Sequence, residues 1–513
     1  MLAGALVKWA PGTVRELLRQ RRLSFWHKTS RSPHEQTIWA YADRHSIEPG
    51  QGFRLMMSAG PGVNTVTGRV EIFRIGDYGK ADRRRVWRSG CLEVAEHGLT
   101  NTAAALGPAW PAALSVEETA SWQTGYHSVD FVEPEGRRHR DIAFLVVTAP
   151  EPRADVLIKI ATATYQAYNK WGGHNLYLYE TPGAVSGHPL GVFERDVPAN
   201  RGDMVSFDRP TPSEFWDWEY YLVLWLERVA REEGFSLAYA TNFDLTREPA
   251  FTSNCRLLIS AGHDEYWSKE EFDRAHDRIF HQGGNTLFLG ANTAYWQVRY
   301  ADVNSPPGNE GQPRGRQLIC FKSMADPVCH RAELNPELHA TARFRDNARR
   351  PETMLTGVGY QSNLPFRYCE NLHYPYRVAN TAFPFFEGTG YRQGEIAGEI
   401  IGHEWDNRDP EAEYACPGEA RVEGATRLWR EGSSHIEPIP AERIKTVFSG
   451  ETVDSAGRKG LAEAVYFESD AGAKVFSSGT NRWTWGLCKA PYTNEKFRRL
   501  NRNLILHFLR SDG

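Results

Sequence analysis

Two side chains that can bind a metal or move a proton lie two positions apart in residues 262–267 (GHDEYW). This segment follows the apolar run 257–260 (LLIS), which predicts a buried strand that ends in a loop at Gly262. Alternate residues of an extended segment project to the same side, so His263 and Glu265 can share one site. An imidazole and a carboxylate placed in this way can bind a metal, transfer a proton or simply pair with each other.

Two further polar and aromatic segments follow predicted strands. Residues 164–174 (TYQAYNKWGGH) come after the apolar run 156–160, and residues 290–296 (GANTAYW) come after the run 286–289. Ligands of open α/β sheets bind at the loops beyond the carboxyl ends of the strands, so these segments predict one pocket. Asn292 would bring an amide to it, and its structural alternative is to cap a helix that begins there.

The elements that position these segments alternate between strands and helices from residue 151 onward. Strands are predicted at 156–160, 237–240, 256–260, 286–289 and 474–478, and helices at 220–233, 269–281 and 494–509. This alternation predicts a mostly parallel sheet covered on both faces. The chain is rich in Gly, Pro and Arg after residue 300, so we expect an irregular, β-rich insertion at about 300–440.

The part of the chain before residue 151 has a different pattern. Residues 46–150 contain short alternating runs separated by Gly, Pro and Asn, which predict an antiparallel β-sandwich. Residues 1–45 form a basic, helix-compatible extension. The expected fold class is therefore all-β plus α/β, with a sandwich at 46–150 and a catalytic domain at 151–513, in a chain whose length suggests about three domains.

Composition excludes several classes of function. The chain has 60 Lys and Arg against 64 Asp and Glu, and its formal charge of -4 argues against a nucleic acid partner. No run of about 18 apolar residues predicts a membrane span, and Lys8 and Pro11 interrupt the short apolar start, so we expect a cytoplasmic protein. The 7 cysteines are odd in number and contain no C-x-x-C pair, so neither a disulfide framework nor a zinc knuckle is expected.

Polar and aromatic motifs follow one another along the chain: residues 122–126 (WQTGY), 165–169 (YQAYN), 171–173 (WGG), 206–210 (SFDRP), 225–227 (WLE), 262–267 (GHDEYW), 292 with 295–296, and 402–406 (GHEWD). Taken in this order, they resemble the large (beta) subunit of N,N-dimethylformamidase from about residue 46 to residue 510. A series of this kind is far more specific than any one motif. His403 stands where the resemblance implies an aromatic residue.

The resemblance implies an amidohydrolase with one iron ion, as Fe(III), held by two tyrosinates and one glutamate. On this chain the ligands would be Tyr126, Tyr168 and Glu265, with Tyr165 as a rival for the second tyrosine. Three hard, anionic oxygens favour a highly charged ion over zinc, whose structural sites prefer sulfur and nitrogen. The expected substrate is a small amide or N-alkylated formamide, and the expected partners are a small second subunit and further copies of the chain.

The same resemblance implies roles for three other residues. Glu404 would be the base that accepts a proton from the attacking water, and His263 would assist proton transfer or orient Glu265. Asn292 would donate a hydrogen bond to the substrate carbonyl or to the developing oxyanion.

Three other functions are alternatives to metal-dependent amide hydrolysis. A sheet of this kind resembles class I glutamine amidotransferases, but their nucleophilic Cys has no counterpart in the turn at 290–292 (GAN). A glycosidase would use Glu265 and Glu404 as its carboxylate pair. In a non-catalytic binding protein these polar groups would only satisfy one another.

Overall fold

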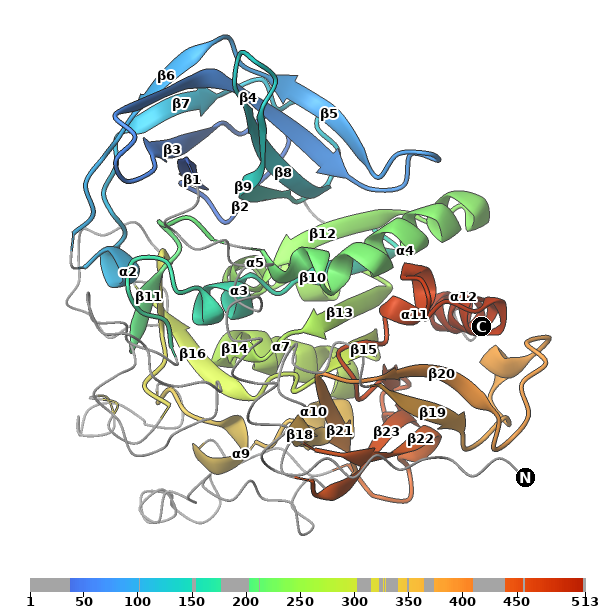
Figure 1. Ribbon diagram of the computed structural model, residues 1–513. Helices are drawn as coiled ribbons and strands as arrows, with labels where there is room; N and C mark the ends of the chain where they lie inside the picture. The colour runs from blue at the N-terminus through green and yellow to red at the C-terminus, as the bar shows by residue number, and fades with distance from the viewer. Residues whose placement is uncertain are drawn as a thin grey trace.

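The structure is a computed structural model of the 513-residue chain. It describes residues 37–100, 102–149, 154–176, 203–211, 213–301, 315–322, 326, 328, 340–347, 350–363, 373–408, 439–454 and 457–510. Residues 1–36 of the expected basic extension and much of the expected insertion at about 300–440 lie outside these ranges. The described chain forms a β-sandwich and a large mixed sheet flanked by helices (Figure 1).

The sandwich consists of two largely antiparallel sheets whose alternate side chains fill one apolar core. Leu55 on one sheet and Val129 on the other are both fully buried there. One sheet has the order β1 (Ile38–Ala42), β3 (Phe53–Ala59), β7 (Ala112–Val116). The other has the order β2 (Ser46–Ile47), β9 (Arg138–Val147), β8 (Gly125–Val132), β4 (Thr65–Ile75), β5 (Arg83–Arg88), with β6 (Leu92–Ala95) on β4 and α2 (Ala103–Leu106) before β7. The predicted antiparallel sandwich is confirmed, and β1 lies ahead of its expected start at residue 46.

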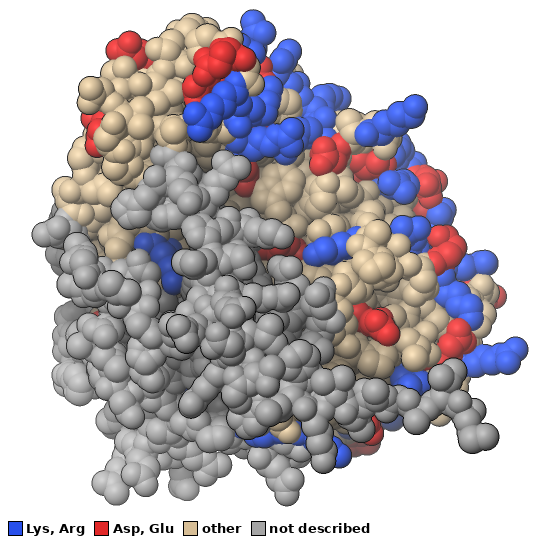
Figure 2. All heavy atoms as spheres, viewed as in Figure 1, with Lys and Arg blue, Asp and Glu red and all other residues tan. Residues whose placement is uncertain are grey.

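Basic side chains gather on the sandwich in the region of β5 (Figure 2). Buried acids compensate part of this charge. Glu71 pairs with Arg85 at 3.3 Å and with Arg138 at 2.8 Å, and Asp130 pairs with Arg83 at 3.2 Å. The arginines of β5 therefore hold strands of the sandwich together as well as facing solvent.

A nine-stranded sheet forms the body of the molecule. Its parallel half consists of β12 (Leu237–Thr241), β10 (Val156–Ile160), β13 (Leu257–His263), β15 (Asn285–Ala291) and β24 (Lys474–Ser477). Its antiparallel half continues with β23 (Lys459–Glu468), β22 (Lys445–Val453), β19 (Tyr374–Val378) and β20 (Ile396–Ile401).

Both faces of the parallel half are covered, as the strand and helix rhythm predicted. On one face Ile158 and Ile259 pack in a core with α4 (Glu219–Glu233) and α12 (Glu495–Leu509). On the other, Leu157 and Leu258 meet α5 (Asn242–Arg247) and α6 (Ala250–Ser253), and Phe288 meets α7 (Lys269–Phe280). Strands buried on both faces explain the nearly continuous apolar runs in the sequence.

The prediction of a mostly parallel sheet was too broad, because four of the strands are antiparallel. Antiparallel strands need no crossover helix, so strands β19, β20, β22 and β23 follow no strand and helix rhythm that the sequence pattern could reveal. The resemblance to a glutamine amidotransferase domain is not confirmed.

Two small sheets complete the described fold, and both lie near the carboxyl edge of the parallel strands. One has the order β11 (Met204–Ser206), β17 (Gln317–Ile319), β16 (Trp296–Tyr300), β14 (Tyr266–Ser268), and the other pairs β18 (Gly359–Asn363) with β21 (Glu404–Asn407). The remaining short helices are α3 (Thr162–Tyr168), η3 (Glu214–Trp216), α9 (Phe344–Asn347), α10 (Thr353–Thr356), η5 (Pro384–Phe386) and α11 (Trp485–Cys488). Among the described helices, none has the length and apolar character needed to cross a bilayer.

Candidate active site

Several of the residues expected to bind the metal or move protons come from the ends of successive parallel strands or from segments that follow them. Tyr168 ends α3, which follows β10, and His263 is the last residue of β13. Asn292 comes directly after β15. The carboxyl ends of neighbouring parallel strands meet at one edge of a sheet, so these side chains converge there. These three segments therefore lie together at this edge.

Tyr168, which is partly buried, and Glu265, which is buried, form a pair of oxygen donors. The Tyr168 hydroxyl donates a hydrogen bond to Oε2 of Glu265 at 2.7 Å. The Glu265 backbone is fixed separately, because its N–H donates to Oγ1 of Thr164 at 3.1 Å. Burial opposes ionisation of Glu265, but the hydrogen bond and charge of His263 hold its pKa below the ordinary value.

His263 lies between three carboxylates. Its Nε2 is 3.3 Å from Oε2 of Glu265 and 3.1 Å from Oε2 of Glu404, and its Nδ1 is 3.4 Å from Oε2 of Glu214. Burial opposes its protonation, but the charge of Glu404 and the hydrogen bonds to the carboxylates raise its pKa well above the ordinary value. This imidazole therefore connects Glu265 to Glu404.

Two amide side chains hold Glu404, which begins β21. Asn292 Nδ2 donates to Oε1 at 3.2 Å, and Asn481 Nδ2 donates to Oε2 at 2.9 Å. Asn292 has a left-handed backbone with φ 55°, and its N–H donates to Asp406 at 2.9 Å. No helix begins at Asn292, since a turn leads straight into β16, so its alternative role as a helix cap is wrong.

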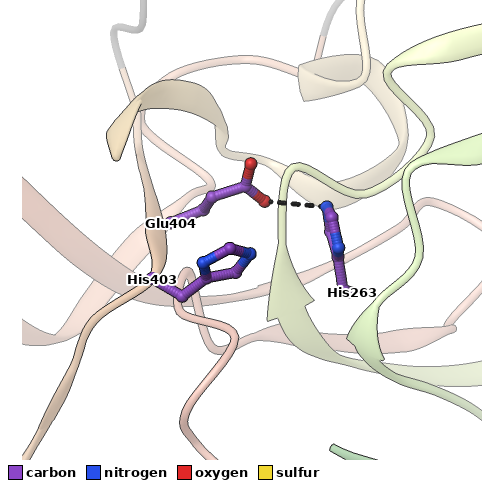
Figure 3. A group of neighbouring side chains, drawn as sticks. All are labelled: His263, His403 and Glu404. Atoms are coloured by element: carbon purple, nitrogen blue, oxygen red, sulfur yellow. Dashed lines mark ion pairs between the residues drawn. The ribbon is translucent and has the colours of Figure 1, made fainter. Parts of the chain in front are cut away.

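His403 adds a second imidazole to this group. It also has a left-handed backbone, with φ 62°, and its ring stacks on Trp218 at a centroid distance of 5.2 Å. The metal-binding atoms of His263, His403 and Glu404 lie within 4.8 Å of one another (Figure 3). All three side chains are buried.

The other two tyrosines expected as ligands or rivals make different contacts. Tyr126 packs in the core between sandwich and sheet, with its ring 3.8 Å from that of Phe215, and no described contact joins it to Tyr168 or Glu265. Burial and the charge of Asp141 raise the pKa of Tyr126 well above the ordinary value. The Tyr165 hydroxyl donates to Oε1 of Glu219 at 2.6 Å, which distinguishes it from Tyr168.

Two contributors to the site did not stand out in the sequence. Asn481 follows β24, the next parallel strand at the same edge, so the strand pattern could have suggested it. Glu214 begins a short helical turn, η3, and carries no motif. The segment with Tyr165 and Tyr168 was expected as a loop but forms helix α3, because adjacent glycines at 172 and 173 obscure a short helix in the pattern.

A buried lysine supports the chain segment that carries His263 and Glu265. Lys159 on β10 lies 2.5 Å from Asp264 and 2.5 Å from Glu271 of α7, and its Nζ is 3.3 Å from the centre of the Trp267 ring. Asp264 also accepts a hydrogen bond from Ser260 at 2.6 Å. Asp264 lies between His263 and Glu265 in the sequence. The ion pair with Lys159 and the hydrogen bond from Ser260 therefore hold the backbone that carries these two site residues.

Replacing Lys159 with Met should destabilise the protein by about 3–5 kcal/mol, because two buried carboxylates then lose their cation. Urea unfolding measures this loss. Lys269→Met is the matched control, since Lys269 pairs with Asp273 on the partly exposed face of α7 and its loss should cost under about 1 kcal/mol. Equal unfolding midpoints for the two variants would contradict the supporting role of Lys159.

Comparison with known proteins agrees with this arrangement of motifs. Residues 69–496 match the family described as N,N-dimethylformamidase beta subunit-like, C-terminal. No curated protein matches the chain. Among solved structures, a pectate lyase from Pectobacterium carotovorum aligns at 14% identity with a TM-score of 0.12, over 24% of this chain and 32% of the lyase, so the match spans about a third of the lyase's length. The family match covers most of the chain, which belongs to the N,N-dimethylformamidase beta subunit-like family.

Proposed function

We propose that this protein is a metal-dependent hydrolase that cleaves the C–N bond of a small amide, with N-alkylated formamides as the first substrates to test. The observation that carries the proposal is the hydrogen-bonded pair of Tyr168 and Glu265 beside the pair of His263 and Glu404. The family match supports amide hydrolysis as the class of reaction. The first pair offers ligands for a metal, and the second offers groups that move a proton.

The donors Tyr168 and Glu265 fit a hard cation such as ferric iron, because a phenolate and a carboxylate are anionic oxygen ligands. Their oxygens are 2.7 Å apart, which is close enough for one ion to contact both. A bound metal ion would polarise the substrate carbonyl and lower the pKa of a water molecule. The resemblance also implies Tyr126 as a ligand, and in the structure its ring stacks on that of Phe215 at a centroid distance of 3.8 Å.

The other residues of the site would move the proton and orient the substrate. Glu404 accepts the proton of the attacking water, and His263, 3.1 Å away, carries it toward the leaving amine. Asn292 uses one amide hydrogen to hold Glu404, and its second hydrogen is left to donate to the carbonyl oxygen. The two asparagines keep Glu404 in one orientation, so the proton acceptor is positioned before substrate binds.

The contact of His263 with both Glu265 and Glu404 favours this chemistry over glycoside hydrolysis. A glycosidase needs open space between its two carboxylates, where the scissile bond lies. Here one imidazole nitrogen contacts both carboxylates, at 3.3 Å and 3.1 Å, and fills that space. A non-catalytic binding protein would not need the proton acceptor Glu404 next to the oxygen ligands Tyr168 and Glu265.

The test is release of amine from a panel of formamides, acetamides and bulkier amides by the iron-loaded protein. We expect turnover of small amides and a fall in rate as the acyl group grows. A panel without any amine release, at full iron occupancy, would remove the proposal. The family's name describes a beta subunit, so we further propose a small partner subunit and association of copies, both of which mass measurement of the purified protein would reveal.

A further inference from the structure

His263, His403 and Glu404 form a second set of metal donors beside Tyr168 and Glu265. Figure 3 shows the Glu404 carboxylate and both imidazole rings directed toward a common space. A zinc ion bound at about 2.0–2.2 Å in tetrahedral geometry holds neighbouring donors about 3.4 Å apart. Nε2 of His263 and Oε2 of Glu404 are already 3.1 Å apart, and all three donors lie within 4.8 Å. A shift of the His403 ring by about 1 Å would complete the set.

The groups around these donors orient them as in zinc sites. Metal-binding histidines usually give their other ring N–H to a carboxylate, and Nδ1 of His263 faces Oε2 of Glu214 at 3.4 Å. Trp218 donates to the same Glu214 oxygen at 3.2 Å and stacks on His403. Trp218 therefore contacts His403 directly and His263 through Glu214.

The charge around His263 also favours a cation. Glu214, Glu265 and Glu404 all lie within 3.4 Å of its ring nitrogens. Carboxylates that are removed from water are costly unless positive charge compensates them. Two nitrogens and one oxygen suit zinc better than ferric iron, which prefers the oxygens of Tyr168 and Glu265.

We propose that His263, His403 and Glu404 form an inhibitory zinc site next to the proposed catalytic metal. A zinc ion here would occupy Nε2 of His263 and Oε2 of Glu404, the atoms that the proposed mechanism uses to carry the proton. The inhibitory consequence rests on the proposed function, whereas zinc binding itself does not.

The experiment adds zinc to the purified, iron-loaded full chain and measures both metals after desalting. We expect one equivalent of zinc beyond the iron, and loss of amide hydrolysis as zinc binds. The His403→Asn variant should bind zinc about 100-fold more weakly, keep its iron and resist inhibition. Asn suits this position because it tolerates the left-handed backbone at φ 62° better than most residues. His97→Asn, on the sandwich, is the matched control and should behave like the wild type.

Each outcome separates the zinc site from the proposed function. Zinc that displaces iron mole for mole, or that binds His403→Asn as tightly as wild type, overturns the second site. Zinc that binds through His403 without slowing an active enzyme overturns the inhibition. If no amide is cleaved but zinc still binds through His403, the zinc site stands and the proposed function fails. X-ray absorption of zinc on the wild type should show two imidazole ligands, a readout that needs no variant.

Discussion

Replacing Tyr168 with Phe should lower iron content and reduce turnover of small amides by about 1,000-fold or more, equivalent to about 4 kcal/mol of transition-state stabilisation. Phe keeps the ring contacts with His263 and Tyr266, at centroid distances of 5.1 Å and 6.3 Å, so the fold should survive. Only the hydroxyl that meets Glu265 at 2.7 Å is removed. Elemental analysis, the absorption band of a ferric phenolate, and kcat measure the result.

Tyr126→Phe is the control, because the family resemblance implies Tyr126 as a metal ligand whereas the structure pairs Tyr168 with Glu265. The Tyr126 ring stacks on Phe215, and no described contact joins Tyr126 to Glu265, so we expect this variant to keep its iron and its absorption band. Loss of iron from Tyr126→Phe would show that Tyr126 moves into the site as a ligand. Full iron content and activity in Tyr168→Phe would overturn the assignment of Tyr168.

Replacing Glu404 with Gln should reduce kcat by about 100- to 10,000-fold while leaving iron bound, because the change removes the proton acceptor but no proposed ligand. The amide has nearly the same shape as the carboxylate and can still accept a hydrogen bond from Asn292 or Asn481. Steady-state kinetics and iron content distinguish this effect from unfolding or metal loss.

Glu399→Gln is the matched control for this variant, since Glu399 is exposed on the neighbouring strand β20 and should tolerate the change. If Glu404→Gln loses its iron as well, Glu404 is a ligand of the catalytic metal and not the base. If it retains wild-type kcat, the proton follows a route without Glu404.

The convergence of His263 and Asn292 could be predicted because their positions follow from strand order. Neighbouring parallel strands end at one edge, and the observed register pairs His263 with Ala291, the residue before Asn292. The point at which β13 ends was harder to predict. Gly262 was expected to end the strand, yet it pairs with Gly290 and the strand continues to His263. A side chain at Gly262 would come within 2.3 Å of Trp218, so the glycine serves close packing here.

The partners of Glu404 could not be predicted from local pattern. Glu404 begins the short strand β21, and Asn481 comes after β24, at positions far apart in the chain. Their contact depends on how β21, which pairs with β18 in a separate sheet, is placed against the segment that follows β24. Hydrophobic periodicity reports on which face of an element is buried, but it does not report such long-range placement. Only the family resemblance singled out Glu404 before the structure did.

The position of the two-stranded sheet of β18 and β21 beside the parallel strands has a consequence for how activity is acquired. Tyr168, Glu265 and Asn292 come from the parallel half, whereas Glu404 is placed by β21 and Asn481 follows β24 at the border. Contacts between residues so distant in sequence form late during folding, because closing long loops is slow. Catalytic competence should therefore emerge last on refolding, and a fragment that ends before residue 400 should be inert however well its parallel strands assemble.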